Sequence, residues 1–533
     1  MKSGWGFLSA LVLVAICFGN SLPNDFILDD YSIVKVNPAI RTIAPIHNLM
    51  TPYWGEHSRA GIYRPLTIFS FSLEYPLWHL WAGGYRLTNL LLHAINGFLL
   101  FLIAEALLQS SAGALAAAAI YLVHPVHTEP IVELVGRSEL LGAMFFLLAW
   151  FFFRQRRTAL CCVAFVLGLL SKENVIAFPA VILLDTWISE RHWRRVSGEW
   201  KRFVAVGASA AAYFAIRLWV LRGIGVPETA QYFDGRMTFL QRELTSGRAF
   251  LKYFQLLFAP VKVTGDYDYN SIPIAGAADW VAWVGLAVVA ATLVYAIRSW
   301  PKKSAVAFGI LFFYLTILPV SNWLIPTSLI MAERFLYLPS IGLCLVAGFI
   351  WTTLPNSSVK HIAAAGILAT AILLCISDTF IWRNELSFYR NIVQVFPKNV
   401  RGRQGYGVAL AEAGRPDLAI EQFQAGLQVI RNSPLLVGLA ESEMQLDRGC
   451  ARARMSLSEA LKLQPHDPFA RWLMGGCFER DGSLEQAEAN YRQAVYETEF
   501  PDPKLLSDWA RVLEKSGRAA EAQEAYRRAG LVR

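Results

Sequence analysis

Two adjacent carboxylates follow the first long apolar stretch of the chain. Asp29 and Asp30 lie in the segment Phe26-Ile-Leu-Asp-Asp-Tyr31, directly after an apolar run near residues 4–22. A carboxylate at the exit of a membrane helix can take the proton of an attacking hydroxyl, which is general-base catalysis. The alternative is an ordinary polar loop start that caps a helix. We expect this loop to be exposed to water, and either aspartate could be the base.

A second polar segment carries side chains that suit a divalent metal. His124 and His127 precede Glu129 in Tyr121-Leu-Val-His-Pro-Val-His-Thr-Glu-Pro130, and imidazole and carboxylate groups are common zinc ligands. Pro125 interrupts helical geometry between the histidines, so their spacing does not fix their relative placement. Hydrogen bonds that order the loop are the alternative. The sequence therefore allows a divalent metal as a cofactor but establishes none.

Three cations beside apolar stretches could bind a phosphate group. They are Arg137 in Val135-Gly-Arg-Ser-Glu139, Lys172 in Leu170-Ser-Lys-Glu-Asn174, and Arg334 in Ala332-Glu-Arg-Phe-Leu-Tyr-Leu-Pro339. Guanidinium and ammonium groups are standard phosphate ligands. For each cation alone, the simpler interpretation is a charge that snorkels to the membrane interface or pairs with a carboxylate. Their gathering on one predicted face favours a function.

The composition indicates that membrane helices position these segments. Of the 533 residues, 55% are hydrophobic and 17% are charged, and the mean hydropathy is +0.38, whereas soluble domains carry about a quarter charged residues. The net charge of +8 comes without a basic run interleaved with aromatics, so no nucleic-acid partner is predicted. Because a spanning helix needs about 20 apolar residues, we expect about eleven spans, near 4–22, 86–108, 113–130, 138–153, 158–170, 174–188, 203–221, 278–298, 304–325, 335–353 and 362–382.

The basic connectors between these stretches predict the orientation. Lys and Arg gather in 154–157, in 191–202 and in 298–303, and such clusters stay in the cytoplasm. With a retained first helix and an odd number of spans, all three connectors fall on the cytoplasmic side. The polar segments above and the whole C-terminal region then lie outside the cytoplasm. Membrane lipid is then a partner of the chain, because it surrounds the spanning helices.

After about residue 383 the charge rises and a repeat begins. Ala419, Ala453, Ala487 and Ala522 are 34, 34 and 35 residues apart, and Gly414, Gly482 and Gly517 mark the turn between the two helices of three units. A small residue where two helices cross, with a larger apolar residue one turn later, is typical of 34-residue TPR units. The pattern predicts about four TPR units in residues 400–533, after a connector at 383–399. Such a solenoid usually binds protein partners.

An ordered set of motifs resembles a known family. The set is Asp29-Asp30, Tyr63-Arg-Pro-Leu-Thr67, Gly84-Tyr-Arg-Leu-Thr-Asn-Leu-Leu-Leu-His93, His124-Pro-Val-His-Thr-Glu129, Gly136-Arg-Ser-Glu-Leu-Leu141, Leu170-Ser-Lys-Glu173 and Glu333-Arg-Phe-Leu-Tyr-Leu-Pro-Ser340. With the TPR tail, it resembles the transmembrane-and-TPR-containing protein O-mannosyltransferases and their bacterial relatives. The resemblance covers nearly the whole chain.

The resemblance implies an all-α architecture, in which residues 1–382 form a GT-C-like transmembrane catalytic domain and a TPR solenoid follows. It implies a sugar carried on a polyprenyl phosphate and transferred to a protein or glycan acceptor outside the cytoplasm. The family's acidic pair matches Asp29 and Asp30. The matching blocks propose substrate-binding roles for Arg64, Glu129, Arg137, Lys172, Glu173, Arg334 and Tyr337. Short inter-span loops and a short repeat tail suggest a bacterial inner-membrane protein with a periplasmic TPR domain.

The resulting hypothesis is an inverting transfer in which an aspartate takes the acceptor's proton and a cation stabilises the leaving phosphate. The alternative of another class is a non-catalytic, membrane-anchored TPR scaffold for envelope proteins. One anchoring helix would suffice for a scaffold, so the many spans favour the enzyme. A transporter is disfavoured because the spans show no internal repeat and the charges lie at their ends. A ligase that moves whole lipid-linked glycans is the closest enzymatic competitor.

Overall fold

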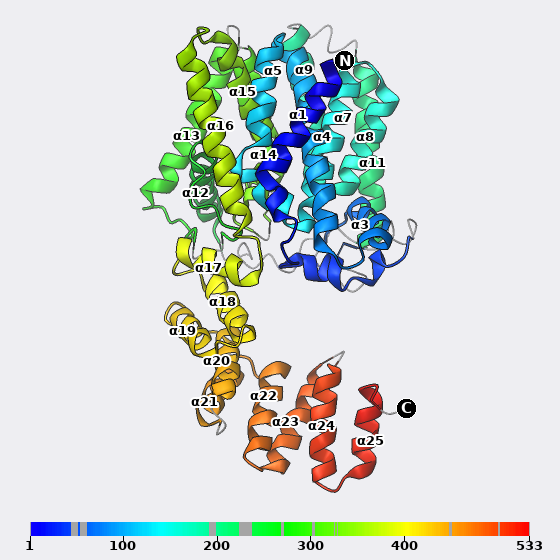
Figure 1. Ribbon diagram of the computed structural model, residues 1–533, viewed down its shortest axis with the longest axis vertical. Helices are drawn as coiled ribbons and strands as arrows, with labels where there is room; N and C mark the ends of the chain where they lie inside the picture. Colours follow the sequence, from blue (N-terminus) through cyan, green and yellow to red (C-terminus); the bar gives the residue numbers. More distant parts are fainter. Residues whose placement is uncertain are drawn as a thin grey trace. The chain divides into compact units, whose positions relative to one another are not determined.

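All the secondary-structure elements in the described part of the chain are helices (Figure 1). The computed structural model describes residues 2–43, 52–53, 61–190, 199–222, 237–267, 271–300, 304–324, 326–327, 329–446, 450–498 and 501–531. Its contacts divide the chain into two units, Met1–Phe388 and Tyr389–Arg533. The all-α prediction is confirmed. Helix α17 (Glu385–Val395) occupies most of the predicted connector.

In the first unit, a helix overlaps each stretch expected to span the membrane. These helices are α1 (Lys2–Phe18), α4 (Ala82–Leu108), α5 (Ser111–Leu122), α7 (Arg137–Arg154), α8 (Thr158–Ser171), α9 (Phe178–Glu190), α11 (Trp200–Leu221), α13 (Trp280–Ser299), α14 (Ser304–Ile317), α15 (Ser340–Thr353) and α16 (Ser358–Thr379). Figure 1 shows many of them side by side in one bundle, which α12 (Phe239–Phe258) joins beside α13.

Within the described ranges, five helical segments are long and apolar enough to cross a membrane. They are Ala82–Leu108, Leu134–Arg154, Trp200–Leu221, Trp280–Ser299 and Ser358–Thr379. Several others are shorter apolar helices of 10–17 residues. Helix α5, for example, ends at Leu122, because His124 precedes a proline and adopts an extended backbone. The count of eleven spans stays a prediction, and the connector residues 191–198 and 301–303 lie outside the described residues.

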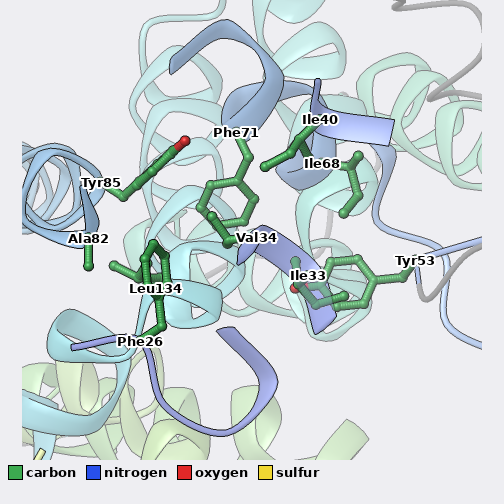
Figure 2. Packing of buried hydrophobic residues seen from close by; sticks show 10 residues of the cluster. All are labelled: Phe26, Ile33, Val34, Ile40, Tyr53, Ile68, Phe71, Ala82, Tyr85 and Leu134. Carbon is green, nitrogen blue, oxygen red and sulfur yellow. The ribbon is translucent and has the colours of Figure 1, made fainter. Parts of the chain in front are cut away.

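The segment after α1 folds against the bundle instead of forming an open loop. It contains two short helical segments, η2 (Tyr31–Lys35) and η3 (Pro38–Ile40), and is followed by α3 (Pro65–Trp78). Figure 2 shows the buried hydrophobic cluster that joins these elements, which consists of Phe26, Ile33, Val34, Ile40, Tyr53, Ile68, Phe71, Ala82, Tyr85 and Leu134. The ring centroids of Phe71 and Tyr85 are 6.0 Å apart, in edge-to-face contact. This cluster fixes the backbone on both sides of the Asp29-Asp30 pair.

The second unit consists of consecutive helix pairs with the spacing that the repeat predicts. They are α18 (Val400–Glu412) with α19 (Pro416–Leu427), α20 (Ser433–Leu446) with α21 (Ala451–Leu463), α22 (Pro468–Arg480) with α23 (Leu484–Glu497), and α24 (Pro503–Lys515) with α25 (Ala519–Arg528). Gly414, Gly482 and Gly517 take φ values of +72°, +78° and +78° at three of the turns, where glycine has no side chain to strain. The second pair has Cys450 at φ +53° instead.

Enlarging a small residue at a repeat crossing is expected to destabilise the second unit. Ala487 is fully buried beside Tyr491 and Leu505, so Ala487→Trp should lower the free energy of unfolding by about 1–3 kcal/mol. Tyr496→Trp on the same helix is the control, because Tyr496 is 89% exposed. Thermal melts of the second unit, followed by circular dichroism, measure both. Equal melting temperatures for the two variants would contradict the repeat assignment.

Candidate functional site

Arg334 is the centre of the candidate site. It lies in the short helix η8 (Glu333–Leu336), and its backbone N–H donates to Oε2 of Glu129 at 2.8 Å. Its guanidinium also pairs with Oε1 of Glu129, and Nη1 lies 4.0 Å from Oε2 of Glu133. Both carboxylates are buried, whereas the Arg334 side chain keeps 25% of its surface exposed. Asp29 lies close enough for its charge to act on Arg334 and Glu133. A firmly held cation therefore stands beside several carboxylates.

The two neighbouring aspartates lie in different environments. Asp29 is half-buried, whereas Asp30 is completely buried. The N–H of Val135 donates to Oδ1 of Asp30 at 3.1 Å, and the N–H of Ile27 donates to Oδ2 at 3.4 Å. Burial raises the pKa of Asp30 to about 7, although Arg86 acts in the opposite direction. The expectation of a water-exposed loop is wrong for Asp30, because the first loop packs on α3 and α4 through its own hydrophobic cluster.

Two polar side chains of α4 hold the segment that carries Glu133. Nε of Arg86 donates to the carbonyl of Val132 at 2.9 Å, and its two other nitrogens donate to main-chain carbonyls of the loop after α1. Nδ2 of Asn89 donates to the carbonyls of Ile131 and Glu133 at 3.2 and 3.3 Å. Because every partner is a main-chain group, these bonds fix the backbones on which Asp29, Asp30 and Glu133 stand.

The close fold of this segment also requires a glycine at position 136. A Cβ atom added to Gly136 would come within 2.6 Å of the Cα atom of Pro130, which is closer than van der Waals contact allows. Gly136 directly precedes α7, so the absence of a side chain lets Glu129, Glu133 and the start of α7 share one tight turn.

A second pair of charged groups lies between α3 and the segment after α8. Arg64 donates to Glu173 through Nε at 2.9 Å and through Nη2 at 2.5 Å. Burial alone would raise the pKa of Glu173, but the Arg64 guanidinium outweighs it and holds that pKa well below its usual range. Nζ of Lys172 lies 2.8 Å from Oε1 of Glu139, whose Oε2 accepts from Asn174 at 3.3 Å. Arg64 and Lys172 thus each have a carboxylate as ion-pair partner.

Arg137 and Tyr337 lie inside the first unit, where protein groups engage their polar atoms. Arg137 is fully buried and donates to Glu74, to Asn89 and to the carbonyl of Tyr85. The hydroxyl of Tyr337 is 2.8 Å from Nδ1 of His93 and accepts from Asn96 at 3.0 Å. These contacts connect α4 with α3, α7 and the start of α15. Neither side chain presents a free polar group toward Arg334.

His124 and His127 do not form a metal site with their neighbours. Nε2 of His124 is 3.0 Å from the carbonyl of Leu257, and its Nδ1 accepts from the N–H of Val126. Both ring nitrogens of His127 are within 2.9 Å of protein oxygens, in Tyr121 and Ser340. Across the described ranges, no group of three or more His, Cys, Asp and Glu side chains is arranged to hold a metal. The ring nitrogens of both histidines have protein partners, and these contacts order the loop.

Sequence reasoning missed Glu133, Arg86, Glu139 and Glu74 as members of these networks. A signal for Arg86 was available, because a charged residue within a 27-residue apolar helix is costly unless it is paired or functional. Glu133 lies four residues after Glu129 and four before Arg137, so its segment was already of interest. Glu74 could not have been found, since its partner Arg137 is far away in the sequence.

The second unit contains a groove of about 470 Å³ on its repeat surface. Residues of α20, α22, α23 and α24 line it: Glu441, Met444, Phe469, Trp472, Leu473, Gly476, Glu479, Arg480, Tyr491, Lys504, Asp508, Arg511 and Lys515. Aromatic rings and the side chains of lysine and arginine therefore line the same groove. Glu479 is already bound by Arg511 and by Lys515, which leaves Lys504 and Arg480 as cations outside that pairing.

No family model matches the chain, but several curated proteins are similar to it. Protein O-mannosyl-transferase TMTC4 of Homo sapiens is 27% identical over 494 residues, covering 79% of this chain and 66% of its own length. Protein O-mannosyl-transferase F38B6.6 of Caenorhabditis elegans is 27% identical, and the match covers 77% of this chain and 61% of the relative. Protein O-mannosyl-transferase TMTC3 of Mus musculus is 24% identical, and the match covers 97% of this chain and 62% of the relative. The chain thus spans about three fifths to two thirds of the length of these relatives.

Two of the solved structures that are similar to this chain have low TM-scores. MamA is 16% identical, with 33% of this chain and 94% of that chain covered and a TM-score of 0.24. YrrB, described as a TPR protein with an unusual peptide-binding site, is 18% identical, with 32% and 84% covered and a TM-score of 0.23. Scores at this level carry no argument, and the repeat assignment rests on the helices. With its long apolar helices and its sequence similarity, the chain is a multi-pass membrane protein that is distantly homologous, over most of its length, to the TMTC protein O-mannosyl-transferases.

Proposed function

We propose that this protein is a membrane glycosyltransferase that moves a sugar from a polyprenyl phosphate to a hydroxyl of a protein or glycan acceptor. The distant homology to protein O-mannosyl-transferases supports this class of reaction. The observation that carries the proposal is Arg334, a partly exposed cation held on a buried carboxylate, with the half-buried Asp29 in electrostatic range. A cation for a leaving phosphate thus lies beside a carboxylate base, as transfer from a lipid phosphate requires.

In the proposed reaction, the acceptor oxygen attacks the anomeric carbon while Asp29 takes its proton. The bond from that carbon to the phosphate oxygen breaks, and the lipid phosphate leaves with the electron pair. Attack opposite the leaving group inverts the anomeric centre. Arg334 stabilises the charge that develops on the phosphate. No carboxylic acid has to protonate a phosphate leaving group, and these steps do not require a metal.

The remaining charged groups have supporting roles in this proposal. Asp30 positions Asp29, because both of its oxygens are bound to main-chain N–H groups. Arg137 and Tyr337 hold helices together instead of touching the donor. The Arg64–Glu173 and Lys172–Glu139 pairs shape the neighbouring part of the site, and the donor phosphate can draw on either cation.

We further propose that the site and the second unit lie outside the cytoplasm. The support is the side preference of the basic connectors. A reporter that is active only in the cytoplasm should be silent when fused to the C-terminus and active when the chain is truncated and fused after Arg157. Reporter fluorescence in cells expressing each fusion measures the sidedness. An active C-terminal fusion would place the second unit, including Arg533 beyond the described residues, in the cytoplasm.

The groove of the second unit favours a protein partner. Its aromatic lining and concave shape suit an extended peptide of an acceptor or of an assembly partner. This observation also supports the alternative function, a non-catalytic scaffold that recruits envelope proteins. The two functions differ in what the loss of Asp29 does, because a scaffold does not need a proton acceptor.

Lipid and glycan profiles of cells with and without the gene test the proposal. The enzyme predicts that a lipid-linked sugar accumulates and that a glycosylated acceptor disappears when the gene is deleted. A deletion strain with unchanged profiles, in which an envelope complex is instead lost, would favour the scaffold. A profile in which a whole lipid-linked oligosaccharide accumulates would assign the chain to the glycan ligases.

A further inference from the structure

Glu133 is a buried carboxylate with one oxygen that accepts no hydrogen bond from the described residues. The residue is 2% exposed, and no hydrogen-bond donor among the described residues reaches its Oε2 atom. Nη1 of Arg334 lies 4.0 Å from that oxygen, beyond hydrogen-bond distance. A buried acceptor without a hydrogen-bond partner is costly and calls for an explanation, and a ligand that donates to it is one such explanation.

The backbone that carries this carboxylate is fixed before any ligand arrives. The backbone of Glu133 is held through its own carbonyl by Asn89 and through the preceding carbonyl by Arg86. Both donors stand on α4, a regular helix, so the carboxylate does not depend on a mobile loop for its placement. Preorganised groups of this kind are typical of binding sites.

We propose that Glu133 binds the sugar of the donor, and that its Oε2 atom hydrogen-bonds the hydroxyl on carbon 2. The proposal rests on the proposed function. When the donor phosphate lies on Arg334, the first part of the sugar to reach Glu133 is the anomeric carbon and its neighbour. In a sugar 1-phosphate the hydroxyl on carbon 2 is the closest one to the phosphate. Asp29 then remains for the acceptor, on the other side of the anomeric carbon.

The chemistry of a sugar hydroxyl suits the electrostatics of this position. Burial raises the pKa of Glu133, and the carboxylates of Asp29, Asp30 and Glu129 add to the rise while Arg334 opposes it. A hydroxyl can donate to a carboxylate and accept from a carboxylic acid, so it pairs with Glu133 in either state. A second phosphate oxygen would pair with only one of them.

Donor binding by the full-length chain in detergent tests this inference. The probes are polyprenyl-phosphate mannose, chosen because the relatives are O-mannosyl-transferases, and its 2-deoxy analogue. We expect Glu133→Ala to weaken binding of the mannose probe by about 10- to 100-fold, the range expected for one hydrogen bond to a charged group. Binding of the 2-deoxy probe should not change. Glu133→Gln should keep part of the preference, because an amide still hydrogen-bonds a hydroxyl.

Each outcome of this experiment supports or contradicts a contact between Glu133 and the donor sugar. Glu243→Ala, which removes a carboxylate of α12, controls for the general loss of an acidic group and should bind both probes as the wild type does. If Glu133→Ala weakens both probes equally, the residue contacts the phosphate or only supports the fold, and the inference is wrong. If it weakens neither, Glu133 does not touch the donor. A wild-type chain that binds neither probe would instead contradict the proposed donor, and this inference would fall with it.

Discussion

Replacing Asp29 by asparagine is expected to lower sugar transfer by about 100- to 10,000-fold, the usual contribution of a general base. The amide has nearly the size of the carboxylate but cannot accept the acceptor's proton. Asp29 is half-buried and within electrostatic range of Arg334 and Glu133, so part of its side chain is open to an acceptor hydroxyl. Complementation of a deletion strain, read as glycosylated acceptor and accumulated lipid-linked sugar, measures the loss.

Two further variants separate chemistry from folding in this experiment. Asp25→Asn changes an exposed carboxylate of the same loop and should keep full transfer. The N–H groups of two main-chain residues donate to the Asp30 carboxylate. In Asp30→Asn, the amide nitrogen faces one of these donors and cannot accept from it, so this variant should lose thermal stability as well as transfer. Full glycosylation with Asp29→Asn would show that the catalytic assignment is wrong, and the scaffold would become the better explanation.

The repeat of the second unit could be predicted almost to the residue, because its information is local. Ala419, Ala453 and Ala487 are each at most 1% exposed, as crossing points of packed helices must be. Gly414 and Gly482 stand at turns with positive φ. Each of these roles depends on neighbours within one repeat, so a spacing of 34 residues was sufficient evidence.

The first unit could be predicted less completely, because its polar groups find partners far away in the sequence. The segments around Asp29, Glu129 and Arg334 were expected on one face, and the structure brings their charges together. What each charge binds was not predictable: Arg137 finds Glu74 on α3, a helix within a region expected to be a loop. A buried ion pair leaves no periodic signal, so sequence can mark a charge as unusual without naming its partner.

The second large effect is expected from Arg334. Arg334→Ala should lower kcat/KM for transfer by about 100- to 1,000-fold, as the removal of a preorganised group that stabilises developing charge typically does. It should also destabilise the protein by roughly 3 kcal/mol, the lower end for breaking a buried pair, since Glu129 then lacks its cation. Arg334→Lys should recover part of the transfer if charge is the main contribution, and it keeps the backbone N–H bond to Glu129.

A double variant distinguishes the two consequences of losing Arg334. In Arg334→Ala with Glu129→Gln, the buried carboxylate that lost its partner becomes neutral, so thermal stability should return most of the way. Transfer should stay low, because nothing replaces the cation beside the leaving phosphate. Melting temperature and transfer measured on the same preparations make the comparison. If transfer returns together with stability, Arg334 acts only through the fold, and the leaving phosphate is stabilised by Arg64 or Lys172 instead.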